Sequence, residues 1–325
     1  MKNIADPPRK SIGVVLCTYN GEKYLREQLD SILCQTRAPD QILILDDCSN
    51  DRTIEIIENF LKKDGRIRLI RNETNLGYAR NFEKGISLCE TDFIALSDQD
   101  DIWFNDKLER LADELEANPG AGIAFCNAEY MLDDGTRTGE IVFKSTDGSP
   151  GDPVLARRKL LSEHWGVDGN LILMDSEMKR FILPNTIIRS HGHDSWICLN
   201  AFFLRTPRYI QEPLSLYRLH PNMASGAIGF VLKGTSYELK KKWYDHRRVA
   251  RNLIRIISSP VKRPKILRER ELRAHHYASD MLMILDELLE RRRHLNLPQI
   301  TVEEQLFFQE MRNRWKADLI DSAHA

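Results

Sequence analysis

The sequence predicts an α/β fold, with a mostly parallel sheet flanked by helices and an α-helical extension at the C-terminus. The first observation behind this prediction lies in the N-terminal third. There, short apolar, β-branched runs alternate with amphipathic segments of about ten or more residues, which is the pattern of βαβ units. The second is a change near residue 230 to long charged segments with apolar residues at helical spacing. A chain of 325 residues with 42% hydrophobic content can form one large core or two ordinary ones.

The elements of the N-terminal third follow in a regular order. Strands are expected over residues 11–17, 41–47, 66–72, 92–98 and 122–131. Helices are expected over residues 22–35, 51–63, 81–90 and 106–118. Right-handed crossovers place every strand-to-helix loop of a parallel sheet along one edge, and ligands bind outside the carboxyl ends of the strands. Polar residues in these loops are therefore expected to meet.

The alternation stops from about residue 128 to 165. Residues 133–140 read as a turn between short strands, and 170–175 and 211–221 read as further strands. Helices are then expected over residues 238–259, 266–295 and 301–321. We accordingly divide the chain into a first domain over residues 1–228 and a basic helical region over residues 229–325.

Charge and cysteine usage limit the possible partners. The formal net charge is −1, so the whole chain gives no indication of a nucleic-acid partner. Lys233–Arg273 nevertheless holds fourteen Lys or Arg against four Asp or Glu, which suits either contact with an anionic membrane surface or a solvated helical face. The six cysteines occur singly, the N-terminus lacks an apolar signal core, and no apolar run approaches the ~18 residues of a membrane span. We expect a cytoplasmic protein, with at most peripheral membrane contact.

Polar clusters follow the first and second predicted strands directly. Thr18 and Asn20 belong to a strand-to-helix turn that suits either close approach to a nucleotide or a helix cap. Asp46 and Asp47 can accept hydrogen bonds from a base or a ribose. Later residues of the same cluster are sufficient to cap the next helix, so capping leaves this pair unexplained.

A third cluster, "SDQDD", follows the fourth predicted strand. Asp98 and Asp100 lie one residue apart, and Asp101 follows. Mg²⁺ and Mn²⁺ bind through one or two carboxylates together with substrate phosphates, so such a pair can hold an ion and orient a diphosphate. Capping a helix accounts for one of these aspartates but not for three.

Two further candidates lie later in the chain. Asp194 opens an apolar segment, where it serves either as a helix cap or as a catalytic carboxylate. His191 and His193 lack a second ligand group at zinc spacing, which disfavours a zinc site. His220 follows an apolar segment and is either structural or a ligand.

These motifs resemble family 2 glycosyltransferases, densely over residues 10–125 and more sparsely through "GHDSW" and "YRLHPN" to about residue 225. The resemblance implies a GT-A fold that binds a nucleotide-sugar. It implies that the following residues line the nucleotide-sugar site: Thr18, Tyr19, Asn20, Asp47, Arg80, Asp98 and Gln99. It further implies Asp100 and His220 as ligands of Mg²⁺ or Mn²⁺, and Asp194 as the catalytic base.

The sequence departs from the family pattern at three positions. Cys17 stands where the family often has proline, and His193 stands where the family often has an acid before the base. Asp101 adds a third carboxylate to the metal motif, so the motif can be aligned in two ways that differ by one residue. The Q-x-x-R-W signature of processive synthases does not occur after Asp194, so we expect addition of a single sugar. The combination of "SDQDDIW" and "HDSW" is similar to a rhamnosyltransferase-like branch.

The resulting hypothesis is an inverting, metal-dependent transfer of one sugar to an acceptor hydroxyl. The donor would be a nucleoside diphosphate sugar, with dTDP-rhamnose and a UDP-hexose as candidates. The acceptor would be a saccharide or a lipid-linked saccharide in bacterial surface polysaccharide assembly. Two alternatives stay open: a nucleotidyltransferase acting on a sugar phosphate, and a non-catalytic nucleotide-sugar-binding protein.

Overall fold

The computed structural model describes residues 9–143, 150–162, 167–184, 192–220, 281–298 and 300–323. The chain forms two compact units, one of residues 1–128 and 143–216, the other of residues 129–142 and 217–325. The predicted domain boundary at residue 228 and the basic segment Lys233–Arg273 lie outside the described residues, and both stay predictions.

Four parallel strands form the first half of the sheet. They are β1 (Ile12–Thr18), β2 (Gln41–Asp46), β3 (Ile67–Arg71) and β4 (Phe93–Ser97). Their order in space is β3-β2-β1-β4. Every residue of β1 and β4 is buried, which explains why these strands read as continuous apolar runs rather than as alternating ones. The predicted α/β fold is confirmed.

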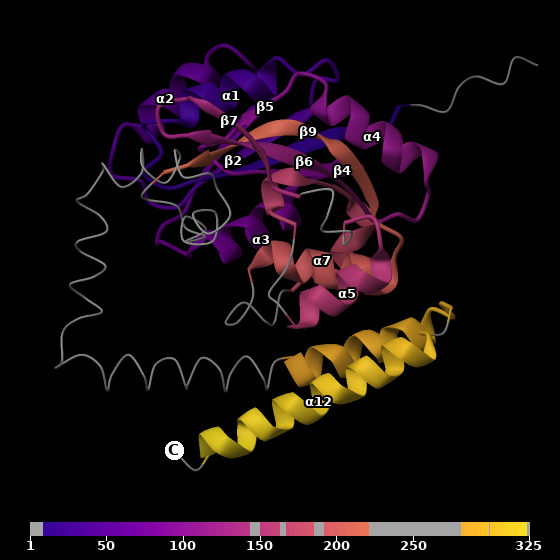
Figure 1. Cartoon of the computed structure of the whole chain (residues 1–325). Helices are drawn as coiled ribbons and strands as arrows, with labels where there is room; N and C mark the ends of the chain where they lie inside the picture. The colour runs from indigo at the N-terminus through magenta and orange to yellow at the C-terminus, as the bar shows by residue number, and fades with distance from the viewer. Residues whose placement is uncertain are drawn as a thin grey trace, which may run out of the picture. The chain divides into compact units, whose positions relative to one another are not determined.

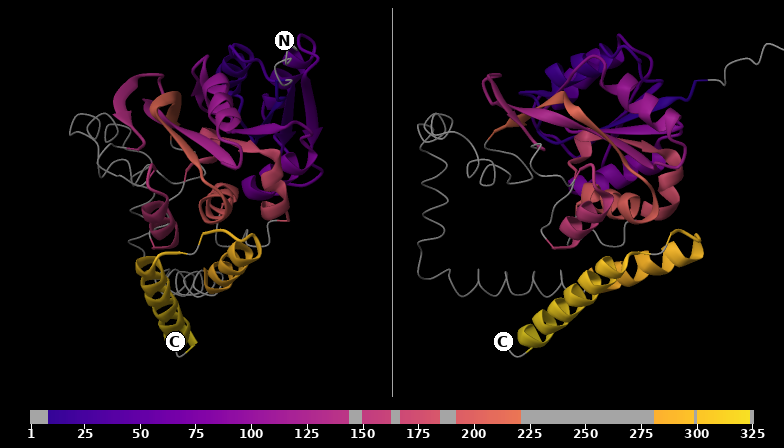
Figure 2. Two further views of the ribbon diagram at one scale, coloured as in Figure 1. Left: turned by 90° about the vertical axis from the view of Figure 1, so that its right-hand side faces the viewer. Right: turned by 45° about the vertical axis from the view of Figure 1, so that its right-hand side comes forward.

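Helices cover both faces of this sheet (Figures 1 and 2). The crossover helices are α1 (Leu25–Leu33), α2 (Thr53–Leu61) and α3 (Tyr78–Leu88). Right-handed connections from β1 to β2 and from β2 to β3 put α1 and α2 on one face. The return from β3 to β4 runs in the opposite direction across the sheet and puts α3 on the other face. The strand order therefore reverses between β1 and β4, and that is where open α/β sheets bind ligands.

The second half of the sheet is antiparallel. Its strands are β5 (Ile102–Trp103), β6 (Ile123–Leu132), β7 (Arg137–Ile141), β8 (Ile172–Asp175) and β9 (Arg208–Leu219). β8 runs antiparallel to β4 and occupies its free edge. β6 pairs antiparallel with β8, so it runs in the same direction as β4 but is separated from it by β8. The sheet as a whole is mixed. The predicted turn over residues 133–140 joins β6 to β7.

The helices that follow complete the first unit. They are α4 (Lys107–Ala117), α5 (Pro153–Ser162), α6 (Lys179–Ile182) and α7 (His193–Leu204). α4 lies beside the end of α1, where Gln35 Oε1 accepts a hydrogen bond from Leu108 N at 2.9 Å. α7 is almost wholly buried and packs against α3 and α5 (Figure 1). Trp196 Nε1 donates to Ile182 O at 3.0 Å and so fixes the first turn of α7.

Two helices form the described C-terminal part of the second unit. One spans residues 281–294 and the other is α12 (Val302–Ala323), in agreement with the predicted helix over residues 301–321. Thr301 and Glu304 form a capping box at the start of α12: Glu304 N donates to Thr301 Oγ1 at 3.1 Å, and Thr301 N donates to Glu304 Oε2 at 3.0 Å. Among the residues that the structure describes, none of the helices has the length and apolar character of a membrane span.

Candidate active site

The end of β1 is tied to the end of β2 through buried side chains. Thr18 is 2% exposed, and its hydroxyl donates to Asp46 Oδ2 at 3.1 Å. Asp46 Oδ1 accepts from Ser49 N at 3.0 Å. The Thr18 hydroxyl is therefore engaged within the protein, and its carbonyl oxygen accepts a hydrogen bond from Asp47 N at 2.9 Å. Asp46 is a structural acid that shapes the second loop.

The loops after β1 and β2 hold each other through Asn20. Asn20 has a φ of 50°, a left-handed conformation that asparagine tolerates better than most residues. Its N–H donates to Ser49 Oγ at 2.9 Å, and its Oδ1 accepts from Asn50 N at 2.9 Å. The predicted nucleotide-site residue Asn20 thus sets the spacing of the two loops.

Gln99 connects the loop after β1 to the loop after β4. Its Oε1 accepts from Tyr19 N at 2.9 Å and its Nε2 donates to Tyr19 O at 3.1 Å. A Cβ at Gly21 would lie 2.2 Å from Gln99 Oε1, so glycine is needed for this close approach. Both ends of the Gln99 amide are engaged, which gives this residue a positioning role. The Tyr19 side chain remains 49% exposed at the surface.

Asp47 is buried and holds the loop that precedes α3. Its Oδ1 accepts from Asn72 Nδ2 at 2.7 Å and from Leu76 N at 2.8 Å. Its Oδ2 accepts from Gly77 N at 2.8 Å. A carboxylate oxygen can accept two hydrogen bonds, so Oδ2 retains capacity for one donor from a nucleobase. The sequence motif alone did not indicate that Asp47 also holds the loop before α3 in place.

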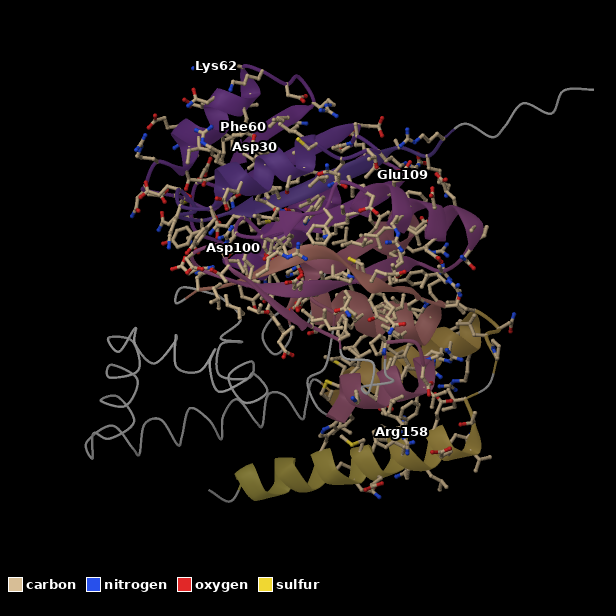
Figure 3. The ribbon with its side chains drawn as sticks, turned by 45° about the horizontal axis from the view of Figure 1, so that its top comes forward. Asp30, Phe60, Lys62, Asp100, Glu109 and Arg158 are labelled. Carbon is tan, nitrogen blue, oxygen red and sulfur yellow. The ribbon has the colours of Figure 1, made fainter. Side chains whose placement is uncertain are left out.

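The three aspartates after β4 have different surroundings. Asp101 is 3% exposed, and its carboxylate accepts a hydrogen bond from Asn170 Nδ2. Asp98 and Asp100 are partly exposed, and Figure 3 shows Asp100 at the rim of the sheet layer. The inward engagement of Asp101 favours Asp98 and Asp100 as the pair that faces a ligand.

Negative charge accumulates around Asp98. Although Asp98 is partly exposed, its carboxyl is largely desolvated by the surrounding protein, which raises its pKa well above the usual value, and four neighbouring carboxylates raise the pKa further. In decreasing order of effect these neighbours are Asp100, Asp101, Asp168 and Asp194. Asp194, more than ninety residues away in sequence, therefore shares an electrostatic environment with the strand-end loops. A bound cation would relieve the repulsion between these groups.

The donor set suits Mg²⁺ or Mn²⁺ bound partly by substrate. Within the described ranges, no three His, Cys, Asp or Glu side chains converge as a preformed metal site. Mg²⁺ characteristically takes one or two protein carboxylates and completes its shell with phosphate oxygens and water. Carboxylates after β4, in an excess of negative charge, fit that arrangement better than a closed protein cage.

Asp194 lies in the first turn of α7, where the helix N-terminus favours negative charge. Its Oδ1 accepts from Ser195 N at 2.7 Å. A Cβ at the N-cap residue Gly192 would lie 2.5 Å from that same oxygen, so the small N-cap leaves room for the carboxylate. Asp194 is partly exposed, as a proton acceptor for a substrate must be.

His193 is buried beneath the first turn of α7. Its ring stacks on Phe82 of α3 with centroids 4.0 Å apart, and it is 6% exposed. Neither ring nitrogen has a hydrogen-bond partner among the described residues. Burial lowers the pKa of His193 against the opposing charge of Asp194, so the ring is neutral and packs as an aromatic group. His191 lies outside the described residues.

The turn of Asp168, Gly169 and Asn170 joins the acidic loop to α7, and sequence reasoning did not find it. A Cβ at Gly169 would lie 2.6 Å from His193 Nε2, so α7 packs directly on this backbone. Asn170 meanwhile holds Asp101. Burial and the charge of Asp194 raise the pKa of Asp168 to about 7. The only sequence signal was the polar interruption "VDGN" before β8.

Lys107 supports this turn from beneath. It is 1% exposed, and its Nζ donates to Asn170 O at 2.5 Å and lies 4.2 Å from the centroid of the Trp103 ring. Burial lowers the pKa of Lys107 to about 8, and the nearby carboxylates of Asp101 and Asp98 limit that decrease. The ammonium therefore remains mostly protonated at neutral pH and partly offsets the carboxylate charge.

Two further predicted site residues are Arg80 and His220. Arg80 is exposed in the first turn of α3, with Nη1 3.9 Å from Glu83 Oε2, so its guanidinium is accessible from solvent. His220 is buried at the end of β9 and belongs to the second compact unit. Its assignment as a metal ligand therefore stays a prediction.

The elevated pKa of Asp168 predicts how stability depends on pH. An unfolded aspartate titrates near pH ~3.9. Between that value and the native value of about 7, the native state retains a proton that the unfolded state has lost, so stability falls as pH rises. An asparagine at this position cannot titrate, so the variant Asp168→Asn should not lose this stability. Measured in EDTA, the unfolding free energy of Asp168→Asn minus that of wild type is expected to increase by ~2–3 kcal/mol from pH 5 to pH 8.

Urea unfolding at both pH values measures this difference. Asp30→Asn, at an exposed position on α1, is the control for loss of one carboxylate. An equal stability difference between Asp168→Asn and wild type at pH 5 and pH 8 would contradict the elevated pKa.

The sequence of this chain is similar to a known family model and to known proteins. The sequence model described as "Glycosyl transferase family 2" matches residues 13–174, which include β1 to β4 and the Asp168 turn. The chain is 31% identical over 251 residues to the dTDP-rhamnosyl transferase RfbG of Shigella flexneri, covering 70% of this chain and 80% of that protein. It is 28% identical over 255 residues to the uncharacterized glycosyltransferase MJ1057 of Methanocaldococcus jannaschii, covering 77% and 85%.

Solved structures show the same fold at low sequence identity. S. aureus TarS residues 1–349, in complex with UDP, superposes with a TM-score of 0.56 at 16% identity, covering 96% of this chain and 88% of that chain. A second structure of the same protein, in complex with UDP-GlcNAc, gives a TM-score of 0.54.

The mixed sheet and its helix layers form a GT-A-type fold, and the similarity to the family model and to RfbG makes the protein an enzyme of the glycosyltransferase class. More narrowly, the chain belongs to glycosyl transferase family 2.

Proposed function

We propose that the enzyme transfers a single sugar, with inversion, from a nucleoside diphosphate sugar to an acceptor hydroxyl. The observation that carries this proposal is the contact path from the loop of Asp98, after β4, to Asp194, at the start of α7: Asp101 accepts a hydrogen bond from Asn170 Nδ2, and the adjoining Gly169 packs directly on His193. One group lies at the switch point where open α/β sheets bind ligands, and the other is a partly exposed carboxylate at a helix N-terminus. Donor and proton acceptor therefore belong to one site.

The donor would lie across the ends of β1, β2 and β4. We assign the nucleobase to the surface between Asp47 and Arg80, and the nucleotide's remaining contacts to the loop of Thr18, Tyr19 and Asn20, where the Tyr19 side chain is 49% exposed. Asp98 and Gln99 shape the floor of this surface. The relative RfbG is named a dTDP-rhamnosyl transferase, and TarS was solved with UDP and UDP-GlcNAc, which supports dTDP-rhamnose and UDP-hexoses as the first donors to test.

Asp194 would act as the general base. A hydroxyl is a weak nucleophile, and a carboxylate that takes its proton as the new bond forms contributes typically ~10²–10⁴-fold. Inversion requires the hydroxyl to attack from the face opposite the departing diphosphate. One positioned carboxylate is sufficient for this route, because no covalent intermediate on the protein is required.

Mg²⁺ or Mn²⁺ would be held by Asp100, with Asp98 beside it and His220 as the further predicted ligand. Such an ion supplies Lewis-acid stabilisation of the diphosphate leaving group. The protein residues around it have their own tasks: Asp101 anchors the loop through Asn170, and Lys107 supports that anchor from beneath.

The acceptor would be a saccharide or a lipid-linked saccharide of surface polysaccharide assembly. We place the enzyme in the cytoplasm, with peripheral membrane contact through Lys233–Arg273, which lies outside the described residues. Flotation with anionic liposomes tests that contact: salt-sensitive flotation of the full chain is expected, and failure to float would contradict it.

A donor screen tests the proposed reaction. With Mn²⁺ present, we expect release of nucleoside diphosphate from one class among UDP-, dTDP- and GDP-sugars, by hydrolysis even when no acceptor is added. The alternative nucleotidyltransferase would instead release pyrophosphate from a nucleoside triphosphate and a sugar phosphate. Pyrophosphate release without any nucleoside diphosphate release would refute the transfer reaction, and binding of donor without turnover would favour the non-catalytic alternative.

A further inference from the structure

Tyr78 is a large aromatic residue left open at the candidate site. It is the first residue of α3 and is 55% exposed, although the neighbouring Ala79 and Phe82 of the same helix are buried. A half-exposed tyrosine at a folded surface is unremarkable by itself. Its position relative to the assigned site residues is what requires explanation.

Tyr78 lies between the donor side of the site and the base. Its N-cap residue, Gly77, donates its N–H to Asp47 Oδ2 at 2.8 Å. On the other side, the Tyr78 ring meets the His193 ring edge-on with centroids 6.1 Å apart, and a Cβ at Gly192 would lie 3.7 Å from Tyr78 Cε2. The ring is therefore held at the start of α7, beside Asp194.

The ring that Tyr78 contacts is itself packed against a second aromatic ring. Phe82, one helical turn further along α3, stacks on His193 with an interplanar angle of 14°. His193 has no hydrogen-bond partner among the described residues for either ring nitrogen, so it contributes an aromatic surface and not a polar one. Tyr78 thus meets the buried His193 ring, which itself stacks on Phe82, while more than half of the Tyr78 surface faces solvent.

We propose that the Tyr78 ring is the platform on which the pyranose ring of the acceptor sugar packs. This inference rests on the proposed function, because Asp194 is taken as the base. The attacking hydroxyl must lie at Asp194, so a side chain beside Asp194 touches the molecule that carries that hydroxyl. A pyranose has an apolar C–H face that matches an aromatic ring, and sites of this kind combine aromatic walls with a few polar groups.

The Tyr78 hydroxyl adds a hydrogen-bonding group to the platform. Burial and the charge of Asp194 both raise the pKa of Tyr78 above its ordinary value, so the phenol stays protonated throughout the neutral range. It can donate to, or accept from, a sugar hydroxyl at the ring edge. The packing role belongs to the ring and the hydrogen bond to the hydroxyl, which lets two substitutions separate them.

The experiment uses the full chain with UDP or dTDP and Mn²⁺, and methyl pyranosides of glucose, galactose, mannose, rhamnose and N-acetylglucosamine as probes. Saturation-transfer NMR measures pyranoside affinity, and calorimetry measures nucleotide affinity separately. We expect Tyr78→Ala to weaken pyranoside binding by about tenfold, in line with the value of one aromatic contact, with nucleotide affinity unchanged. Tyr78→Phe should retain most of the pyranoside affinity.

Leu88→Ala, at a 41% exposed position in the last turn of the same helix, is the matched control and should behave as wild type. Equal pyranoside binding by Tyr78→Ala and wild type would overturn the platform, and so would loss of nucleotide affinity in Tyr78→Ala, which would assign the ring to the donor. A wild type that binds nucleotide but none of the pyranosides would also overturn the platform and leave the proposed function intact. Failure to bind any nucleotide would count against both.

Discussion

Asp194→Asn is expected to lower kcat by ~10²–10⁴-fold while the affinity for donor nucleotide stays close to that of wild type. The amide has nearly the same shape as the carboxylate and can still accept through its oxygen from Ser195 N, so the first turn of α7 should persist. It cannot take a proton from the acceptor hydroxyl. The effect should therefore appear in turnover and not in binding, which steady-state kinetics and calorimetry measure separately.

Glu177→Gln is the matched control, because it removes an exposed carboxylate from the same compact unit. It should leave turnover unchanged. If Asp194→Asn retains most of the wild-type activity, Asp194 is not the base. An equal loss of nucleotide affinity would instead assign Asp194 to donor binding.

Asp100→Ala is expected to abolish the metal-dependent part of nucleotide binding. Asp98 and Asp100 are the partly exposed aspartates of the loop, and Asp100 is the carboxylate that raises the pKa of Asp98 most, so Asp100→Ala removes a candidate ligand from this acidic loop. Calorimetry with UDP or dTDP should show a gain in affinity on adding Mn²⁺ to wild type and no gain with Asp100→Ala.

Two companion variants make this result specific. Asp113→Ala, at a 68% exposed side chain on α4, should retain the full effect of Mn²⁺. Asp101→Ala should chiefly lower stability, because it leaves the buried amide of Asn170 without its carboxylate partner. An unchanged Mn²⁺ effect in Asp100→Ala, together with its loss in Asp101→Ala, would reverse the assignment of the two residues.

The parallel half of the sheet and the convergence of its loops could be predicted from sequence. Continuous apolar runs such as that of β1 are produced by burial on both faces, and the crossover rule then leaves one edge for the polar clusters. For the same reason, the ligand edge near Thr18, Asp47 and Asp98 follows from local pattern alone. The structure places these residues at the ends of β1, β2 and β4 as expected.

The antiparallel half could not be predicted in the same way. A strand such as β6 carries no local signal for its partner, and β8, which separates it from β4, comes forty residues later in the chain. Pairing there depends on contacts between distant segments. The Asp168 turn was missed for a related reason, since its importance comes from His193 and Asp101, which are distant in sequence.

Side-chain direction was the other limit of sequence reasoning. Gln99 and Thr18 occupy the expected positions, yet their polar groups already hydrogen-bond to other groups of the protein, Tyr19 and Asp46. A motif shows which residue types occur at a strand end, but it does not show which atoms the fold itself engages. Such residues act on the site by fixing its loops.

The most direct test is a calorimetric titration of UDP and of dTDP into the full chain, in Mn²⁺ and again in EDTA. It asks whether the ends of β1, β2 and β4 form a cation-assisted site for a nucleoside diphosphate. We expect saturable one-to-one binding of at least one of the two nucleotides in Mn²⁺, weakened at least tenfold in EDTA. Absence of binding to both nucleotides, or equal affinity in Mn²⁺ and EDTA, would contradict a cation-assisted nucleotide-sugar site at this edge of the sheet.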